Sequence, residues 1–364
     1  MPVIRTACVK VGRLLALLVC VAMIGVPTPA AAAAQSTTAR KTATKAPAKS
    51  TAARTTAAKR LATARTSAAS RRVRAARAKA ALQARQLREA QEPQYKLDAS
   101  GALVPDLRAE AAIIYDPQTG HVLWEENSTN QRSIASITKV MTATVFLEDA
   151  PDPNREVLIE RADMRGASTT YLRAGYKVTV DNLLHLLLIG SDNAAARVLA
   201  RISPYGAQGF IDRMNEKASE LGLESTHYAD PSGLLSANVS SAYDMARLIT
   251  FATTDERIGS IMRMPQYSFA VGRQTISLHS TNQLVRGGDV EVVGGKTGFI
   301  RAAGYCLATL LRLPQSGTQV AVVVLGARSN AGRFWETRHL FNWLSTKTQE
   351  VFGATPATAT ATAN

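Results

Sequence analysis

The region from about residue 109 to 345 begins and ends with strand-like patterns and is mostly helical between them. At its start, AAIIYD (111–116), the turn-forming PQTG and HVLWEE (121–126) predict a β-hairpin. Beyond residue 290, VEVVGG, GYCLATLLRL and TQVAVVVLGA predict strands separated by short turns at KTG and PQSG. We therefore expect the two terminal segments to share one sheet, which brings the ends of the domain together in space.

Helical patterns fill the middle of this region. Between roughly 136 and 260, apolar residues recur three or four positions apart, as in VDNLLHLLLIG and AAARVLARI. The amphipathic segment RFWETRHLFNWLS closes the domain. We expect one α/β domain over residues 93–347, followed by a disordered Thr/Ala tail over 348–364.

Positive charge is concentrated in the N-terminal quarter of the chain. The 364 residues have a net charge of +15, yet residues 35–88 carry 15 Lys and Arg without one acidic residue, and the rest from 89 carries 25 basic against 28 acidic residues. Residues 35 to about 70 cannot bury enough apolar surface to fold, whereas the composition of 71–92 favours helix. We predict a basic arm over 35–92, disordered or partly helical. The arm could be a solvated tether, or it could bind anionic envelope polymers or the membrane surface. Nucleic acid is disfavoured as its partner, because residues 35–88 lack aromatic side chains to stack on bases.

The first 34 residues have the pattern of an export signal. Three positive charges precede the apolar run 14–26, and a small-residue stretch PTPAAAAA follows. The alternative is an uncleaved membrane anchor, although the run is short for a span. Export predicts a periplasmic or other extracytoplasmic protein. Two cysteines would leave with the signal, and Cys306 would remain as a lone, buried thiol.

Ser136 and Lys139 form the first motif that could carry chemistry. They lie at the start of a helical pattern, and a spacing of three puts the amine and the hydroxyl on one helix face. A lysine with a lowered pKa can take the serine proton, and a helix N-terminus offers free backbone N–H groups to an oxyanion. The structural alternative is a serine near an N-cap with a solvated lysine.

Ser191, Asp192 and Asn193 form the second motif. They lie between two strongly apolar helical patterns, where polar side chains would be held rigidly and partly buried. The pattern S-x-N recurs elsewhere in the chain, so only its place distinguishes this copy. The structural alternative is a helix C-terminus at Gly190 followed by an N-cap at Ser191.

Lys296, Thr297 and Gly298 form the third motif. Adjacent strand positions point to opposite faces, so a regular strand cannot direct both Lys296 and Thr297 into one cleft. The neighbouring glycines 294 and 295 make a bulge plausible. By itself, K-T-G could be an ordinary turn.

Together, the three motifs resemble the S-x-x-K, S-x-N and K-T-G set of penicillin-binding proteins and serine β-lactamases. With RSIASITKVMTA, HYADPSGL (227–234) and GGKTGFIRAAGYCLA, residues 109–345 resemble the low-molecular-mass D-alanyl-D-alanine peptidases. The likeness is greatest to the periplasmic endopeptidases, which lack the extra C-terminal β-domain of the carboxypeptidases. This resemblance implies a β-lactamase/transpeptidase-like α/β (α+β) fold, with an antiparallel sheet flanked by helices and a helical subdomain.

The resemblance also implies residue roles. Ser136 would attack the D-alanyl carbonyl, Lys139 would take its proton, and Ser191 would relay a proton to the leaving amine. Lys296 and Thr297 would bind polar groups of the substrate and raise the positive potential that keeps Lys139 neutral, and the N–H groups of Ser136 and Phe299 would form the oxyanion hole. The residues implied to bind substrate are Asn193, Lys296, Thr297, Gly298 and Phe299.

The sequence thus predicts a serine-type D-alanyl-D-alanine endopeptidase that acts on peptidoglycan peptides and is inhibited by β-lactams. A carboxypeptidase that trims pentapeptide stems is the alternative. A non-catalytic envelope- or polyanion-binding protein is disfavoured because every motif member is present, and a β-lactamase because HYADPSGL offers no Glu to activate water. No metal or cofactor is expected, since the five histidines are scattered and no phosphate-binding glycine loop follows a strand.

Overall fold

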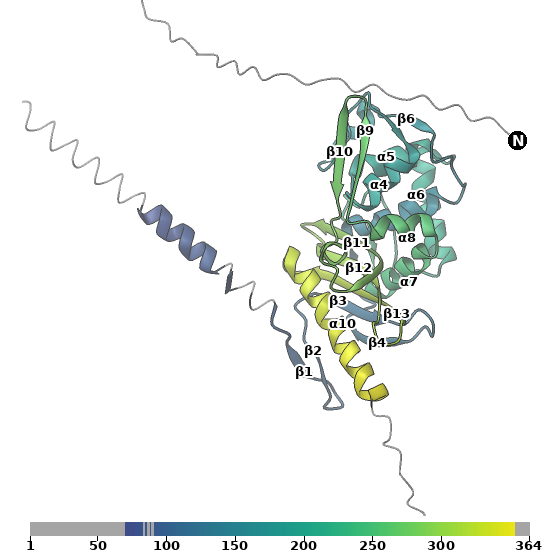
Figure 1. Cartoon of the computed structure of the whole chain (residues 1–364). Helices are drawn as coiled ribbons and strands as arrows, with labels where there is room; N and C mark the ends of the chain where they lie inside the picture. Colours follow the sequence, from purple (N-terminus) through teal and green to yellow (C-terminus); the bar gives the residue numbers. More distant parts are fainter. Residues whose placement is uncertain (1–69, 83, 86–87, 89–90, 354–364) are drawn as a thin grey trace, which may run out of the picture. The chain divides into compact units, whose positions relative to one another are not determined.

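The main sheet joins the two ends of the domain. The computed structural model describes residues 70–82, 84–85, 88 and 91–353 (Figure 1). Five antiparallel strands lie in the order β11-β12-β13-β3-β4, and β13 pairs with β3 from Ala321 opposite Tyr115 to Leu325 opposite Ala111. The predicted shared sheet and N-terminal hairpin are therefore confirmed. The strands are β3 (Ala111–Tyr115), β4 (Val122–Glu126), β11 (Glu291–Ile300), β12 (Gly304–Arg312) and β13 (Gln319–Ala327).

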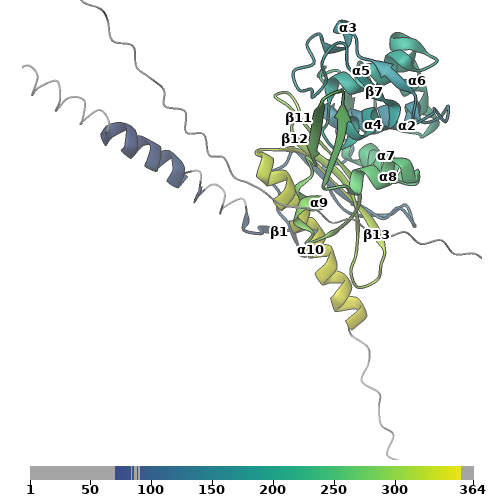
Figure 2. The ribbon, with the colours of Figure 1, turned by 45° about the horizontal axis from the view of Figure 1, so that its top comes forward.

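Helices cover both faces of this sheet. Figures 1 and 2 show α10 (Asn330–Gly353) along one face, where Phe334 and Leu340 belong to the same buried cluster as Ile114 of β3. On the other face, Ile113 joins a larger cluster with the remaining helices. Both faces of β3 are buried, which explains its continuous apolar run AAII. The predicted fold class, an antiparallel sheet flanked by helices, is confirmed.

The remaining helices mostly form a helical subdomain, as predicted. Its central helix α2 is buried along its whole length. Polar side chains cap α4, α5 and α7 among others: Thr179 accepts from the Asn182 N–H, Asp192 from Ala195, and Ser241 from Asp244. The helices are η1 (Ala135–Ile137), α2 (Thr138–Phe146), α3 (Arg161–Met164), α4 (Val180–Leu188), α5 (Asn193–Ile202), α6 (Gly206–Glu220), α7 (Ala242–Thr253), α8 (Glu256–Arg263) and α9 (Gln283–Gly287).

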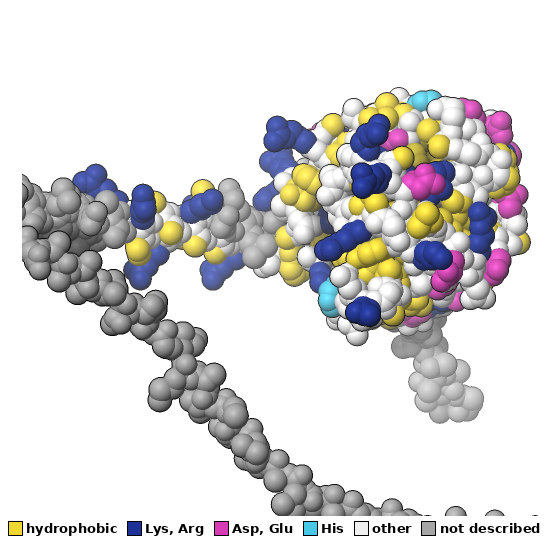
Figure 3. Space-filling model, turned by 90° about the horizontal axis from the view of Figure 1, so that it is seen from above, with side chains coloured by type: hydrophobic (Ala, Val, Ile, Leu, Met, Phe, Trp, Pro, Cys, Tyr) yellow, Lys and Arg dark blue, Asp and Glu magenta, His cyan; other side chains and the backbone are white. Residues whose placement is uncertain are grey.

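Four small two-stranded sheets complete the described chain. The sheet of β9 and β10 is a hairpin that our sequence analysis did not predict. Its alternating apolar residues and the turn at Gly272 were the available signal. Figure 3 looks onto the end of the molecule that carries this hairpin, and Lys and Arg side chains are spread across it. The sheets are β1 (Tyr95–Leu97) with β2 (Leu103–Pro105), β5 (Arg132–Ser133) with β8 (Val239–Ser240), β6 (Glu156–Leu158) with β7 (Lys177–Thr179), and β9 (Gln266–Val271) with β10 (Gln274–His279).

The turn predicted at KTG is wrong. Strand β11 runs through Lys296 and Gly298 to Ile300, and the chain turns at 301–303 instead. Lys296 is opposite Ala308 and Gly298 opposite Cys306 on β12, so ladder pairing keeps this edge strand extended on the side that faces β12. The turn predicted at PQSG does occur, since the Gly317 N–H bonds back to the Leu313 carbonyl.

At the two ends of the described chain, the helices agree only in part with the boundaries expected from the sequence. Residues 71–82 are helical and exposed, as their composition predicts. The closing helix α10 continues to Gly353, beyond the boundary expected at 347. The predicted signal at 1–34, most of the arm and residues 354–364 lie outside the described residues. Among those that the structure describes, no helix has the length and apolarity needed to cross a membrane.

Candidate active site

Ser136 lies where a tight 3-10 turn passes into helix α2. The preceding residue, Ala135, has φ +49°, a left-handed conformation that a non-glycine residue rarely adopts. Gly233 packs against this turn, and a Cβ there would collide with the Ala135 carbonyl oxygen. The backbone of Ser136 is therefore held from both sides, while its side chain stays partly accessible.

Lys139 is completely buried beside Ser136. Its Nζ lies 2.8 Å from Ser136 Oγ, 2.7 Å from Asn193 Oδ1 and 2.5 Å from the Ser232 carbonyl oxygen. Burial lowers the pKa of Lys139 to about 7, and the charge of Arg197 adds to the lowering. Burial is thus the chief cause, rather than the neighbouring Lys296 charge that the resemblance implied. The alternative of a solvated lysine is wrong.

The segment 191–193 places three side chains in three different roles. Asp192 caps helix α5, so the structural alternative of an N-cap at Ser191 is wrong. Ser191 has φ +56°, and its Oγ accepts a 2.7 Å hydrogen bond from Lys296 Nζ. Asn193 is buried and donates from Nδ2 to the Ala167 carbonyl at 2.7 Å, which directs its Oδ1 to Lys139. Because Asp192 supplies the helix cap, the Ser191 hydroxyl can bond Lys296 in the site.

Lys296 and Thr297 both reach the site, although adjacent strand positions point to opposite faces. Lys296 is buried, and its pKa is held well below the ordinary range by burial and by the charges of Lys139 and Arg333. Thr297 Oγ1 donates to Thr281 Oγ1 at 2.7 Å, and the Thr281 N–H bonds to the carbonyl two residues before Ser191. Lys296 therefore contacts Ser191 directly, whereas Thr297 is linked to the segment before Ser191 only through Thr281.

The Gly298–Phe299 peptide passes close to the backbone of Ser136. A Cβ on Gly298 would lie 2.6 Å from the Ile134 carbonyl oxygen and 3.1 Å from Ser136 N, so only glycine fits. Arg333 of α10 donates to the Gly298 carbonyl at 2.9 Å. Because C=O and N–H of a trans peptide point in opposite directions, the Phe299 N–H faces the free edge of β11, where Ser136 lies. Sequence reasoning missed Arg333, which has no local motif.

A second element that sequence reasoning left without a role is the loop DPSG within HYADPSGL. Asp230 accepts hydrogen bonds from the N–H groups of Ser232 (2.6 Å), Gly233 (2.9 Å) and Leu235 (2.7 Å). These bonds fix the Ser232 carbonyl against Lys139. The turn-forming D-P-S-G composition was the available signal.

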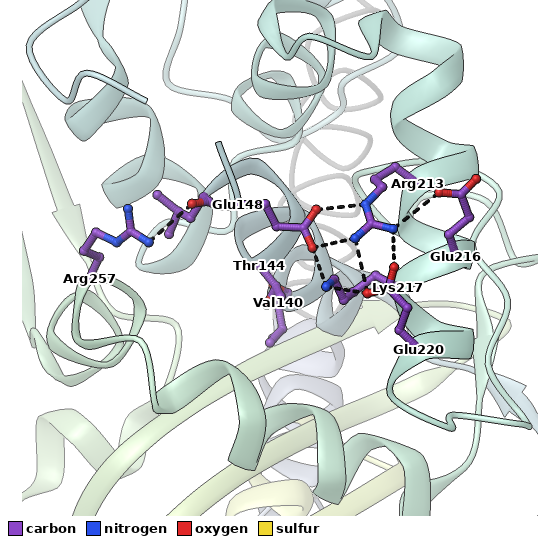
Figure 4. Close-up of polar contacts among 9 residues, drawn as sticks. Val140, Thr144, Glu148, Arg213, Glu216, Lys217, Glu220 and Arg257 are labelled. Carbon is purple, nitrogen blue, oxygen red and sulfur yellow. Dashed lines mark hydrogen bonds and ion pairs between the residues drawn. The ribbon is translucent and has the colours of Figure 1, made fainter. Parts of the chain in front are cut away.

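The opposite end of α2 is anchored by ion pairs. Figure 4 shows Glu148, just after the helix, held by Arg213 and Lys217 of α6. Arg257 donates to the Leu147 carbonyl at 3.3 Å. A pocket of about 540 Å³ opens beside this cluster but contains none of the motif residues, so it is separate from the predicted chemistry. The anchors fix the helix on which the motif serine and lysine stand.

Comparison with known proteins agrees with this geometry. The family profile of D-alanyl-D-alanine carboxypeptidases, peptidase family S11, matches residues 98–329. The chain belongs to this family of serine peptidases. The D-alanyl-D-alanine endopeptidase of Haemophilus influenzae is 33% identical over 228 residues, which cover 62% of this chain and 78% of that protein. The D-alanyl-D-alanine carboxypeptidase of Bacillus subtilis is 31% identical over 230 residues, covering 60% of this chain and 57% of that protein.

A solved relative supports the same fold. The DD-transpeptidase of Streptomyces K15 superposes on this protein with a TM-score of 0.62 and is 26% identical in sequence. The superposition covers 66% of this chain and 97% of the transpeptidase. Among the described residues of the S11 chain, no cluster of three His, Cys, Asp or Glu side chains could hold a metal ion.

Proposed function

We propose that the protein is a D-alanyl-D-alanine endopeptidase that hydrolyses peptide cross-links of peptidoglycan through a Ser136 acyl-enzyme. The observation that carries this proposal is the arrangement around Lys139. A neutral amine has two N–H bonds and one lone pair. In the neutral form, N–H bonds to Asn193 Oδ1 and the Ser232 carbonyl leave the lone pair to accept from Ser136 Oγ, 2.8 Å away. A lysine with a pKa of about 7 in this position is suited to act as the general base.

The reaction follows from these positions. Ser136 Oγ attacks the D-alanyl carbonyl carbon while its proton passes to Lys139. The resulting oxyanion accepts hydrogen bonds from the N–H groups of Ser136 and Phe299. Ser191, held by Lys296, relays a proton to the departing amine, and the C–N bond breaks to leave an ester on Ser136. Water then hydrolyses this ester. A β-lactam acylates the same serine by opening its ring, and the resulting ester is hydrolysed slowly.

Substrate binding is assigned to the residues around this centre. Asn193 would hold the substrate peptide, and Lys296 and Thr297 would bind its carboxylate or other polar groups. Gly298, also assigned to this set, lets β11 approach the Ser136 turn closely. We infer that the enzyme acts outside the cytoplasm, in the periplasm, because the sequence begins with the pattern of an export signal.

The endopeptidase proposal is supported by the likeness to proteins of that name. The chain is 33% identical to the D-alanyl-D-alanine endopeptidase of Haemophilus influenzae and 31% identical to the carboxypeptidase of Bacillus subtilis. The carboxypeptidase reaction is the second candidate, because the matching family profile carries that description.

One experiment separates the two reactions. The full chain is incubated with a pentapeptide monomer and with a D-alanyl cross-linked dimer, and products are identified by mass spectrometry. Conversion of dimer to monomers with intact pentapeptide is expected. Release of one terminal alanine from the pentapeptide with intact dimer would instead identify a carboxypeptidase.

A further inference from the structure

Five exposed cations lie on α3, on the segment that leads into β7 and in the β9–β10 turn. Within the part of the chain that the structure describes, none of these five side chains makes an ion pair or side-chain hydrogen bond. Figure 3 looks onto the end of the molecule that carries the β9–β10 hairpin and shows Lys and Arg side chains spread across it. We call this group the basic face. It consists of Arg161 and Arg165 around α3, Arg173 and Lys177 at the start of β7, and Arg273 in the β9–β10 turn.

Two acidic residues beside Arg161 are paired elsewhere, and the exposed Glu156 of β6, opposite Thr179, is the acidic residue across the strand pair from Lys177. Glu160 and the buried Asp163 both pair with Arg201, with N–O distances of 2.9 Å. The sequence from residue 89 onward has 25 basic and 28 acidic residues, so the positive charge here is a local concentration. Figure 3 shows Asp and Glu side chains mainly toward one margin of this end.

The basic face is continuous with the wall of the active site. Between Arg165 and Arg173, the carbonyl of Ala167 accepts from Asn193 Nδ2 at 2.7 Å. The Tyr171 N–H donates to Asp192 Oδ2 at 2.7 Å. The same short segment therefore carries exposed cations at its ends and contacts the second motif at its centre.

Two further contacts connect its members. Arg197, one turn after Asn193 on α5, donates to the Arg165 carbonyl. Tyr176 Oη donates to Gln274 Oε1 at 2.6 Å, which ties the segment before Lys177 to the hairpin that carries Arg273. An anionic ligand that extends from the active site would meet these cations in succession.

We propose that the basic face binds carboxylates of the substrate's stem peptides that lie outside the scissile D-alanyl bond. This rests on the proposed function, since a cross-linked substrate enters with two peptide stems and only one bond is cut. The side chains of the face are exposed and solvated, so each contact is weak, and their contribution is to recognise long acidic substrates over short neutral ones. Selection for cross-linked polymer would then reside beside the catalytic centre.

The test compares the double variant Arg173→Gln/Lys177→Gln with the wild-type full chain. Two substrates are used: a D-alanyl cross-linked dimer with free carboxylates, and the same dimer with the carboxylates remote from the scissile bond amidated. We expect the variant to raise KM for the free dimer about three- to tenfold, with kcat changed less than about twofold. The wild-type preference for the free dimer should be reduced in the variant, which retains three of the five cations.

The matched control is Arg286→Gln/Arg328→Gln. These two exposed arginines lie on α9 and after β13, and the control removes the same amount of charge. It should leave KM for both dimers unchanged. Added salt should raise the wild-type and control KM for the free dimer more steeply than that of the test variant.

Each contrary result has a distinct meaning. An unchanged KM in the test variant, or an equal rise in the control, would overturn the proposal. If KM is unchanged but binding to anionic lipid vesicles is weakened, the face binds a membrane surface instead. If the test variant folds poorly, Arg273→Gln, in a turn remote from the motif segments, supplies the same KM comparison. Failure of the wild type to cut either dimer would reject the endopeptidase function itself.

Discussion

Acylation of Ser136 should depend on pH through Lys139. Burial lowers the pKa of Lys139 to about 7, so the amine is neutral in about half of the molecules at pH 7 and in about 1% at pH 5. An ordinary lysine would be neutral in less than about 0.1% of molecules at pH 7. Only the neutral amine can accept the serine proton. The second-order acylation rate should therefore rise about tenfold per pH unit below pH 7 and level off above it.

The assay is stopped-flow acylation by a fluorescent penicillin between about pH 5 and 9. The penicillin is chosen so that none of its groups ionises in this pH range. Removal of the Arg197 charge by Arg197→Gln should move the midpoint to higher pH, by less than about one unit, because that charge lowers the Lys139 pKa. Arg286→Gln is the control and should leave the midpoint unchanged. A rate independent of pH, or a midpoint in the ordinary lysine range, would refute Lys139 as the base.

Three further predictions address the other parts of the structure. Gly233→Ala should lower the free energy of unfolding by about 1–3 kcal/mol in urea titrations and should slow acylation, because the added Cβ would collide with the Ala135 carbonyl. An unchanged free energy of unfolding would contradict this packing. Lys296→Met should abolish dimer cleavage yet raise stability at neutral pH. A folded pKa below the unfolded one makes wild-type stability rise with pH up to the ordinary lysine range, and the variant should lose the Lys296 part of this slope. A chain of residues 93–364 should cut soluble dimer at the wild-type rate but sediment less with insoluble sacculi; equal sedimentation would assign the basic arm a tether role.

The strand and helix pattern was predictable because local periodicity encodes it. The strands β3 and β13 are short continuous apolar runs bounded by turn residues, and the helix α4 repeats apolar residues at helical spacing. The KTG turn was mispredicted for a physical reason. Glycine-rich sequence suggests a turn, but Gly298 is needed for close approach to Ser136, and ladder pairing with β12 keeps the segment extended.

The motif residues of the candidate site were found from sequence, but their supports were not. Ser136 and Lys139 share a helix, so spacing alone brings them together. Arg333 contacts the Gly298 carbonyl from a helix that follows two more strands, and only the folded sheet makes them neighbours. The Ser232 carbonyl acts through the backbone, which leaves no side-chain signal in the sequence.

The central claim is that Ser136 becomes the acyl-enzyme, and peptide mapping tests it most directly. The full chain is labelled with penicillin, digested, and the modified residue is located by tandem mass spectrometry. We predict one penicilloyl ester, on Ser136, and no label in a Ser136→Ala variant that retains the wild-type circular dichroism spectrum. Label on another residue, or persistent labelling of the folded variant, would contradict the account.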